Sequence, residues 1–214
     1  MQKINSSILL TVFFLCSFAA FGQKAEPVKA DTSYDDLVAK VKAGDTTVDF
    51  KAMRIAFSKT KAYSPYGNES DPVKAAFAAI EQKKFKDAIK KTDESLKQCY
   101  IDMDAHVAAS IAYKGLGDTV KSDFHKAVYL GLVNSILSSG DGKTPETAYL
   151  VISTHEEYIT FRALGLGAGG QALVHLNEHS YDVQTSADPT TKAAMKIYFN
   201  IDIVWKAETD MFSK

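Results

Sequence analysis

Apolar residues between positions 34 and 137 recur every three or four residues, which is the spacing of one buried face of an α-helix. The first part of this pattern predicts two short helices, over residues 34–41 and 50–57. A loop is expected over residues 60–72, because two prolines, a glycine and several small polar residues interrupt the pattern. Asp71-Pro72 then predicts a new helix start, since the carboxylate can accept from free amide groups and proline fits the first helical turn.

The helical pattern continues to about residue 137 and carries an internal repeat, with breaks expected near residues 83–84, 100–103 and 115–118. An offset of 34 residues places Val73 on Val107, Ala75 on Ala109 and Ala78 on Ala112. This period resembles the tetratricopeptide repeat, a stacked helix–turn–helix unit. The resemblance implies repeats over about residues 69–102 and 103–136. An ordinary helical bundle with chance periodicity is the alternative.

After residue 138 the pattern becomes that of a small sheet. Turn-forming residues precede a β-favouring run over 148–153, and Thr154 with Glu157 predicts a capped short helix that Gly165 ends. Further strands are expected over residues 172–176, 181–185 and 194–205. The predicted fold class is therefore α+β. A tetratricopeptide-like antiparallel helical stack over 34–137 precedes a small α/β module over 138–214, a mostly antiparallel β-sheet with one helix, packed on the stack.

The first 22 residues have the pattern of a secretory signal peptide. Lys3 precedes an apolar run from Ile8 to Phe14, and small residues stand at Ala20 and Gly22. This pattern predicts cleavage near Gly22-Gln23, a flexible lead-in over residues 23–33, and export to the periplasm or the medium. The apolar run is shorter than the roughly 20 residues that span a bilayer, so no membrane span is expected.

Charge and cysteine content restrict the partners and the chemistry. The chain has 25 Lys and Arg against 26 Asp and Glu; removal of Lys3 with the signal leaves 24 − 26 = −2. This near-neutral balance gives no indication of a nucleic-acid partner. Cys99 is the one cysteine beyond the predicted cleavage site, so no internal disulfide is expected. Its position near the end of a helical stretch favours a buried structural thiol.

Two motifs match patterns of zinc or dinucleotide binding, but the secondary structure expected around each does not suit such a site. His175, Glu178 and His179 match the H-x-x-E-H pattern, in which one helical face holds Zn²⁺ and the Glu is the base for its bound water. Here the motif lies between strand-like runs and reads as a hairpin turn at Asn177-Glu178. The glycines of residues 165–170 match G-x-G-x-x-G, but a helix leads in and a strand leaves, the reverse of a dinucleotide site. We therefore expect no cofactor and no metal.

Polar and aromatic residues of the loops are the candidates for binding. Tyr63 and Tyr66 lie in a polar loop and either pack against the helices or contact a partner, since tyrosine offers contact area at low entropic cost. Arg54 lies on the helix before them and could join either arrangement, or be solvated or locally paired. His and Asp residues near the strands could form a polar site. The candidate ligand- or partner-binding residues are Arg54, Tyr63, Tyr66, Asp141, His179 and Asp182.

The chain as a whole resembles a family of exported proteins of unknown function from Bacteroides-type bacteria. The resemblance covers roughly residues 34–205 and depends on short segments that are moderately specific as a set: Phe50 with Arg54, 63–66, 139–144, 148–153, 156–158, 179–182 and 198–200. It implies a tetratricopeptide-like helical part, a C-terminal sheet and an envelope or secreted location, and it implies no activity.

These observations favour a non-catalytic module that binds a peptide or a protein partner of the cell envelope, or acts as a scaffold there, on the concave surface of the helical stack. Two alternatives remain open at this point. One is a hydrolase, either a zinc-dependent peptidase at His175, Glu178 and His179 or a site of other His and Asp residues. The other is a structural component of the envelope.

Overall fold

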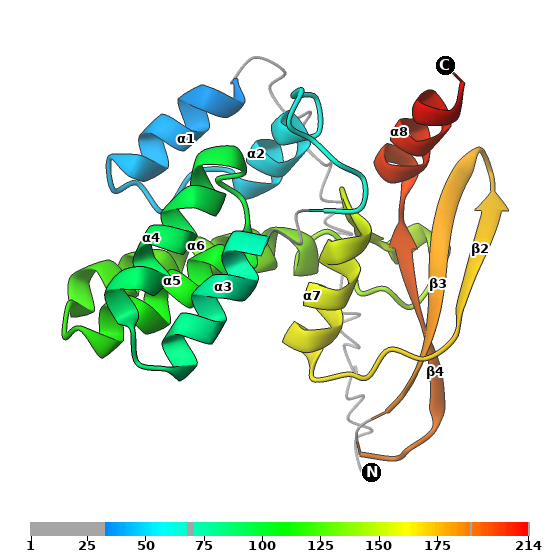
Figure 1. Cartoon of the computed structure of the whole chain (residues 1–214). Helices are drawn as coiled ribbons and strands as arrows, with labels where there is room; N and C mark the ends of the chain where they lie inside the picture. The colour runs from blue at the N-terminus through cyan, green and yellow to red at the C-terminus, as the bar shows by residue number, and fades with distance from the viewer. Residues whose placement is uncertain (1–32, 68–70, 189, 214) are drawn as a thin grey trace, which may run out of the picture. The chain divides into compact units, whose positions relative to one another are not determined.

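The computed structural model describes residues 33–67, 71–188 and 190–213, which belong to one compact unit (Figure 1). The predicted signal peptide, its cleavage site and nearly all of the lead-in over 23–33 lie outside the described residues. No helix in the described part of the chain has both the length and the apolar character that crossing a membrane requires. The helical half consists of α1 (Tyr34–Lys42), α2 (Phe50–Phe57), α3 (Asp71–Glu81), α4 (Phe85–Gln98), α5 (Met103–Gly115) and α6 (Thr119–Leu137).

The predicted helix boundaries over residues 71–137 are confirmed, and local chemistry accounts for them. α3 begins at Asp71, and the breaks between α3, α4, α5 and α6 fall where the pattern predicted them. Asp102 accepts a hydrogen bond from the amide of Ala105, and Asp118 accepts one from that of Lys121, so both carboxylates satisfy free N–H groups at the start of a helix. Alanines let the helices of this region approach closely, and the four that are almost completely buried together are Ala76, Ala88, Ala108 and Ala112.

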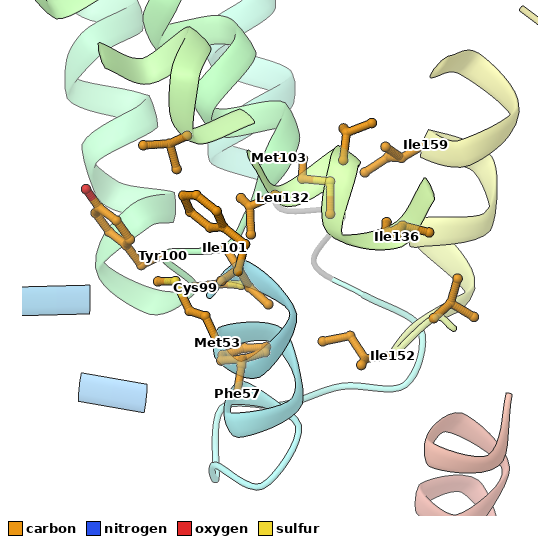
Figure 2. Packing of buried hydrophobic residues seen from close by; sticks show 14 of the residues in the cluster. Met53, Phe57, Cys99, Tyr100, Ile101, Met103, Leu132, Ile136, Ile152 and Ile159 are labelled. Carbon is orange, nitrogen blue, oxygen red and sulfur yellow. The ribbon is translucent and has the colours of Figure 1, made fainter. Parts of the chain in front are cut away.

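The largest hydrophobic core joins the helices to the C-terminal half. Its buried cluster contains Met53 and Phe57 of α2, Leu132 and Ile136 of α6, and residues of the chain between α4 and α5 (Figure 2). Cys99 lies in this core with a 4% exposed fraction, which confirms the prediction of a buried thiol.

The C-terminal half is a four-stranded sheet with helices on one face. Its strands are β1 (Tyr149–Leu150), β2 (Gln171–Leu176), β3 (His179–Ala187) and β4 (Ala194–Asn200), in the order β1-β4-β3-β2. β1 pairs parallel to β4, and the other two pairs are antiparallel. α7 (Thr154–Leu164) packs on the sheet through Phe161 and Phe199, and α8 (Asp202–Phe212) places Trp205 against His175. The α+β class and the mostly antiparallel sheet are therefore as predicted.

Three local predictions in this half are wrong. The strand expected over 194–205 ends at Asn200 and is followed by helix α8, because the carboxylate of Asp202 accepts from the amide of Ser180 and fixes the chain at the turn. The strand expected over 148–153 shortens to β1. The cap of α7 is Ser153, whose hydroxyl accepts from the amide of Glu156, one residue earlier than expected.

The predicted hairpin at Asn177-Glu178 is confirmed, and it strains the backbone. Asn177 has φ 50° and Glu178 has φ 67°, the left-handed conformation that a two-residue hairpin turn requires at both positions. Asparagine tolerates this conformation, whereas glutamate does not favour it.

Glu178→Gly should therefore raise the free energy of unfolding by about 0.5–1 kcal/mol, because glycine adopts this conformation without steric cost. Urea unfolding measures the change. Glu94→Gly, within helix α4, is the control and should lower the free energy by a similar amount. A loss of stability in Glu178→Gly would contradict the assigned turn conformation.

Candidate functional site

Arg54 lies at the junction between the helical half and the sheet and is 1% exposed. Its Nε donates to Oε1 of Glu156 at 2.7 Å, and its Nη2 donates to Oε2 of the same carboxylate at 2.5 Å, so the pair is bidentate. The guanidinium also donates to the hydroxyl of Ser135 at 3.1 Å and to the carbonyl of Leu150 at 2.8 Å. Glu156 in turn accepts from the amide of Ile152 at 2.8 Å. This network ties α2, α6, β1 and α7 together.

Tyr63 and Tyr66 lie beside this junction in different environments. The hydroxyl of Tyr63 donates to the carbonyl of Ile152 at 2.7 Å, and its ring meets Phe57 edge-on, so this side chain is packed. Tyr66 is 50% exposed. The adjacent cavity, between Tyr63, Ile101, Ile152 and Ile159, has a volume of about 40 Å³. A space of this size holds about one water molecule and no organic ligand.

His155 borders the same cavity and pairs with Asp104. His155 Nε2 donates to Asp104 Oδ2 at 2.9 Å, and Arg162 Nη2 donates to the other carboxylate oxygen at 2.5 Å. The hydrogen bond that His155 donates to Asp104 raises the pKa of His155. Burial alone would raise the pKa of Asp104, but the hydrogen bonds and charges of His155 and Arg162 outweigh it and lower this pKa. The pair links α5 to α7 across the junction and gives the cavity a polar rim.

Two buried carboxyl groups meet between α7 and the sheet. Glu157 is 1% exposed, and Gln184 donates its amide Nε2 to Oε2 of this residue. Burial, followed by the charge of Asp182, raises the pKa of Glu157 to about 9. Oε1 of Glu157 is buried without a hydrogen-bond partner, so the ionised form of this group has neither solvent nor a donor to stabilise it there. Asp182 also accepts from Gln171 Nε2 at 2.6 Å, so it is part of this interior pair.

Two histidines form a second pair, within the helical half, in which His106 is fully buried and His125 is partly buried. His106 Nε2 donates to the carbonyl of Tyr100 at 2.8 Å, and its Nδ1 lies 2.9 Å from Nδ1 of His125. Burial lowers the pKa of His106 to about 3 and that of His125 to about 4, so both rings are neutral near pH 7. A carbonyl only accepts, so Nε2 of His106 carries the proton and His125 Nδ1 donates to the bare Nδ1 of His106.

The H-x-x-E-H residues do not form the helical face that zinc chemistry needs. His175 stands opposite Ser180 in the register of β2 and β3, and His179 stands opposite Leu176, so the two histidines project from opposite faces of the sheet. His175 Nδ1 lies 3.0 Å from the hydroxyl of Ser180, and His179 Nδ1 lies 2.6 Å from Asp202 Oδ2. Among the residues that the structure describes, no group of three His, Cys, Asp or Glu side chains could hold a metal ion. The geometry gives the zinc-peptidase alternative no support.

The face of the sheet that α7 and α8 leave uncovered carries two adjacent hollows. The first has a volume of about 430 Å³ and a polar lining that includes Lys51, Glu146 and His179. The second has a volume of about 440 Å³ and a mainly apolar lining that includes Val174, Val183 and Tyr198. Pro145 and Leu176 border both hollows. Together they form one surface, here called the outer sheet face.

The Asp141 loop borders this outer sheet face. Asp141 Oδ1 accepts from the hydroxyl of Thr147 at 2.6 Å and from the amide of Lys143 at 3.1 Å, which fixes the turn. The carbonyl of Gly142 accepts from the amide of Tyr198 at 2.8 Å, so the loop is bonded to β4. Asp141 therefore shapes the rim on which His179 also lies.

Strand β2 forms the open edge of the same surface (Figure 1). It contains no charged residue and no proline, and it is exposed along nearly its whole length, with Leu173 46% and Leu176 41% exposed. In a two-residue hairpin the residues that flank the turn, Leu176 and His179, form a hydrogen-bonded pair. Such pairs recur at every second residue of an antiparallel ladder, so Val174 and Ala172 also direct their N–H and C=O groups toward β3. The remaining residues direct their N–H and C=O groups outward, and these are Gln171, Leu173 and His175.

The six residues proposed from the sequence thus fall into three places. Arg54 and Tyr63 are at the interior junction with Tyr66 at its surface, and Asp182 is in the buried carboxyl pair. His179 borders the outer sheet face, and Asp141 fixes the loop beside it without lining either hollow. Sequence reasoning missed the edge strand as a candidate. The signal was present, since Gln171 to Leu176 is an uncharged run between a glycine-rich segment and a hairpin turn.

The chain belongs to a family described as a domain of unknown function, DUF4919, whose profile matches residues 23–209. No curated protein matches the chain, and no solved structure does.

Proposed function

We propose that this member of a family of unknown function is a non-catalytic protein-binding module of the cell envelope, exported by the signal at residues 1–22. Its partner would supply an extended segment that adds to strand β2. The observation that carries this proposal is the uncharged, exposed edge strand beside the outer sheet face. An open edge of this kind offers unpaired N–H and C=O groups, and most proteins protect such an edge with charges, prolines or bulges.

The outer sheet face supports the same function. In β-strand addition the main chain supplies the affinity, and pockets for alternate side chains supply the specificity. The apolar hollow along Val174 and Val183 would receive alternate apolar side chains of the added strand, and the hollow beside His179 would receive polar ones. The tetratricopeptide-like helices would then support the sheet. Their concave surface, which the sequence favoured as the binding site, is not needed for this contact.

Leu173→Pro tests the proposal directly. Proline removes the N–H that Leu173 directs outward while leaving the ladder to β3 intact, and an edge strand tolerates this change. Peptides selected from a displayed library on the immobilised chain from Gln23 onward should bind Leu173→Pro at least about tenfold more weakly, a difference of about 1.4 kcal/mol. Titration of purified protein with the synthetic peptide measures this.

Leu173→Ala is the matched control, because it shortens the same side chain but keeps the N–H group. It should retain most of the affinity if the main chain provides the contact. Both variants should keep the wild-type circular dichroism spectrum. The proposal is wrong if the chain is monomeric and enriches no peptide, or if the enriched peptides bind Leu173→Pro as tightly as the wild type.

A further inference from the structure

The outward-facing residues of β2 are arranged symmetrically about Leu173. Gln171 and His175 lie two positions before and after it, and all three present N–H and C=O groups to the open edge. An antiparallel strand of the same sequence, related by a twofold axis beside Leu173, would place Leu173 opposite its own copy. It would also place Gln171 opposite His175 of the other strand. Each of these pairs could exchange two hydrogen bonds.

We propose that strand β2 pairs antiparallel with β2 of a second copy of this chain, about a twofold axis beside Leu173. The inference rests on the proposed function, because it names the partner that supplies the added strand. The sheets of the two copies would then form one continuous sheet.

The side chains match on both faces of such a pair. On the face that the helices cover, Leu173 meets Leu173 of the second copy, which buries a side chain that is 46% exposed in one chain. Gln171 donates its amide Nε2 to Asp182 within the chain, and its carbonyl oxygen can accept from the His175 ring of the other copy. On the outer sheet face Ala172 meets Val174, so the apolar hollow of each copy continues into that of the other.

Charge and closure favour a second copy over an unrelated chain. β2 has no charge, so two copies meet without the repulsion that a charged strand would suffer against itself. The opposite edge of the sheet is β1, only two residues long, which leaves little ladder for a further strand. A contact between two copies of β2 uses the same surface on both, so the assembly closes as a dimer.

Replacing Leu173 by residues of opposite charge gives the sharpest test. Light scattering with size exclusion on the chain from Gln23 onward, from low to high micromolar concentration, should show a dimer that dissociates on dilution. Leu173→Lys and Leu173→Glu should each be monomeric, because two like charges meet at the axis. An equal mixture of the two variants should recover the dimer, because Lys then meets Glu. No other position in β2 would show this pattern, since only a residue at the axis meets itself.

Leu116 provides a matched control, because it is 45% exposed and lies in the turn after α5. Leu116→Lys and Leu116→Glu should each remain dimeric. Circular dichroism of every variant shows that the fold is intact. A wild-type chain that stays monomeric at high micromolar concentration would overturn the inference, as would a dimer that persists in both Leu173 variants or fails to form in the mixture.

The result also separates this inference from the proposed function. A monomeric wild-type chain whose selected peptides still lose affinity in Leu173→Pro would overturn only the second copy and leave strand addition by another protein in place. A monomeric chain that enriches no peptide would overturn both.

Discussion

Replacement of Arg54 by methionine should lower the free energy of unfolding by about 3–5 kcal/mol, since removing one partner of a buried ion pair leaves the other charge uncompensated. The carboxylate of Glu156 would stay in a site where it is 4% exposed. The hydroxyl of Ser135 and the carbonyl of Leu150 would each lose a donor as well. Urea unfolding at pH 7, followed by circular dichroism, measures the loss.

Two further variants separate charge from packing. Arg54→Met combined with Glu156→Gln removes both charges and should recover part of the loss, because no isolated buried charge remains. Arg162→Met is the control: its guanidinium also pairs with a carboxylate, that of Asp104, but its side chain is 54% exposed. This change should cost less than about 1 kcal/mol. Equal losses in Arg54→Met and Arg162→Met would contradict the structural role assigned to Arg54.

Local signals in the sequence predicted most of the helices and the hairpin, because each is fixed by residues close together in the chain. Asp71 and Pro72 set the start of α3, and Asn177 with Glu178 sets the turn between β2 and β3. The alternation of Ile197 and Phe199 also placed the start of β4 correctly.

The end of β4 could not be predicted from residues close to it in the chain. Ile201 and Ile203 continue the alternation, yet the chain turns into α8 and buries Val204. Over so few residues an apolar run fits a strand and a helix equally well. The decision comes from Asp202, whose carboxylate binds the amide of Ser180 and the ring of His179, residues that are distant in the sequence.

The interior polar contacts were beyond the sequence for the same reason. Arg54 and Glu156 are 102 positions apart, and nothing in the spacing of either residue indicates the other. Glu157 follows Glu156 in the same helix, yet it faces Asp182 and Gln184, so its neighbours are a carboxyl group and an amide in place of a guanidinium. Only the packing of α7 on the sheet gives the two glutamates their different environments.

The free energy of unfolding should be greatest close to pH 6.5 and should fall on both sides. On the acid side the histidine pair is responsible. His106 and His125 have pKa values lowered from 6.5 to about 3 and about 4, so the unfolded chain binds protons that the folded chain does not. Stability is therefore lost as the pH falls below 6.5. His106→Gln keeps a donor for the carbonyl of Tyr100 and should make this loss less steep.

On the alkaline side the loss should come mainly from Glu157. Its pKa is raised from 4.5 to about 9, so above pH 4.5 the unfolded chain releases a proton that the folded chain keeps. Its contribution is fully present below pH 4.5 and is lost as the pH rises toward 9, at a slope of up to about 1.4 kcal/mol per pH unit. Above pH 6.5 His106 and His125 no longer oppose this loss, and His155, whose pKa is raised, adds to it. The fall then becomes visible in urea midpoints.

Glu157→Gln imitates the protonated carboxyl group, because it places no charge beside Asp182 and its oxygen can still accept from Gln184. The fall between pH 6.5 and 9 should therefore become shallower in this variant, while Glu94→Gln, an exposed change on α4, should reproduce the wild-type slope. Burial also raises the pKa of Asp102, so this group contributes a loss of the same sign as the pH rises. Identical slopes in the wild type and Glu157→Gln would mean that Glu157 does not keep its proton in the folded chain above pH 6.5, and the assignment of the alkaline loss to this buried carboxyl group would be wrong.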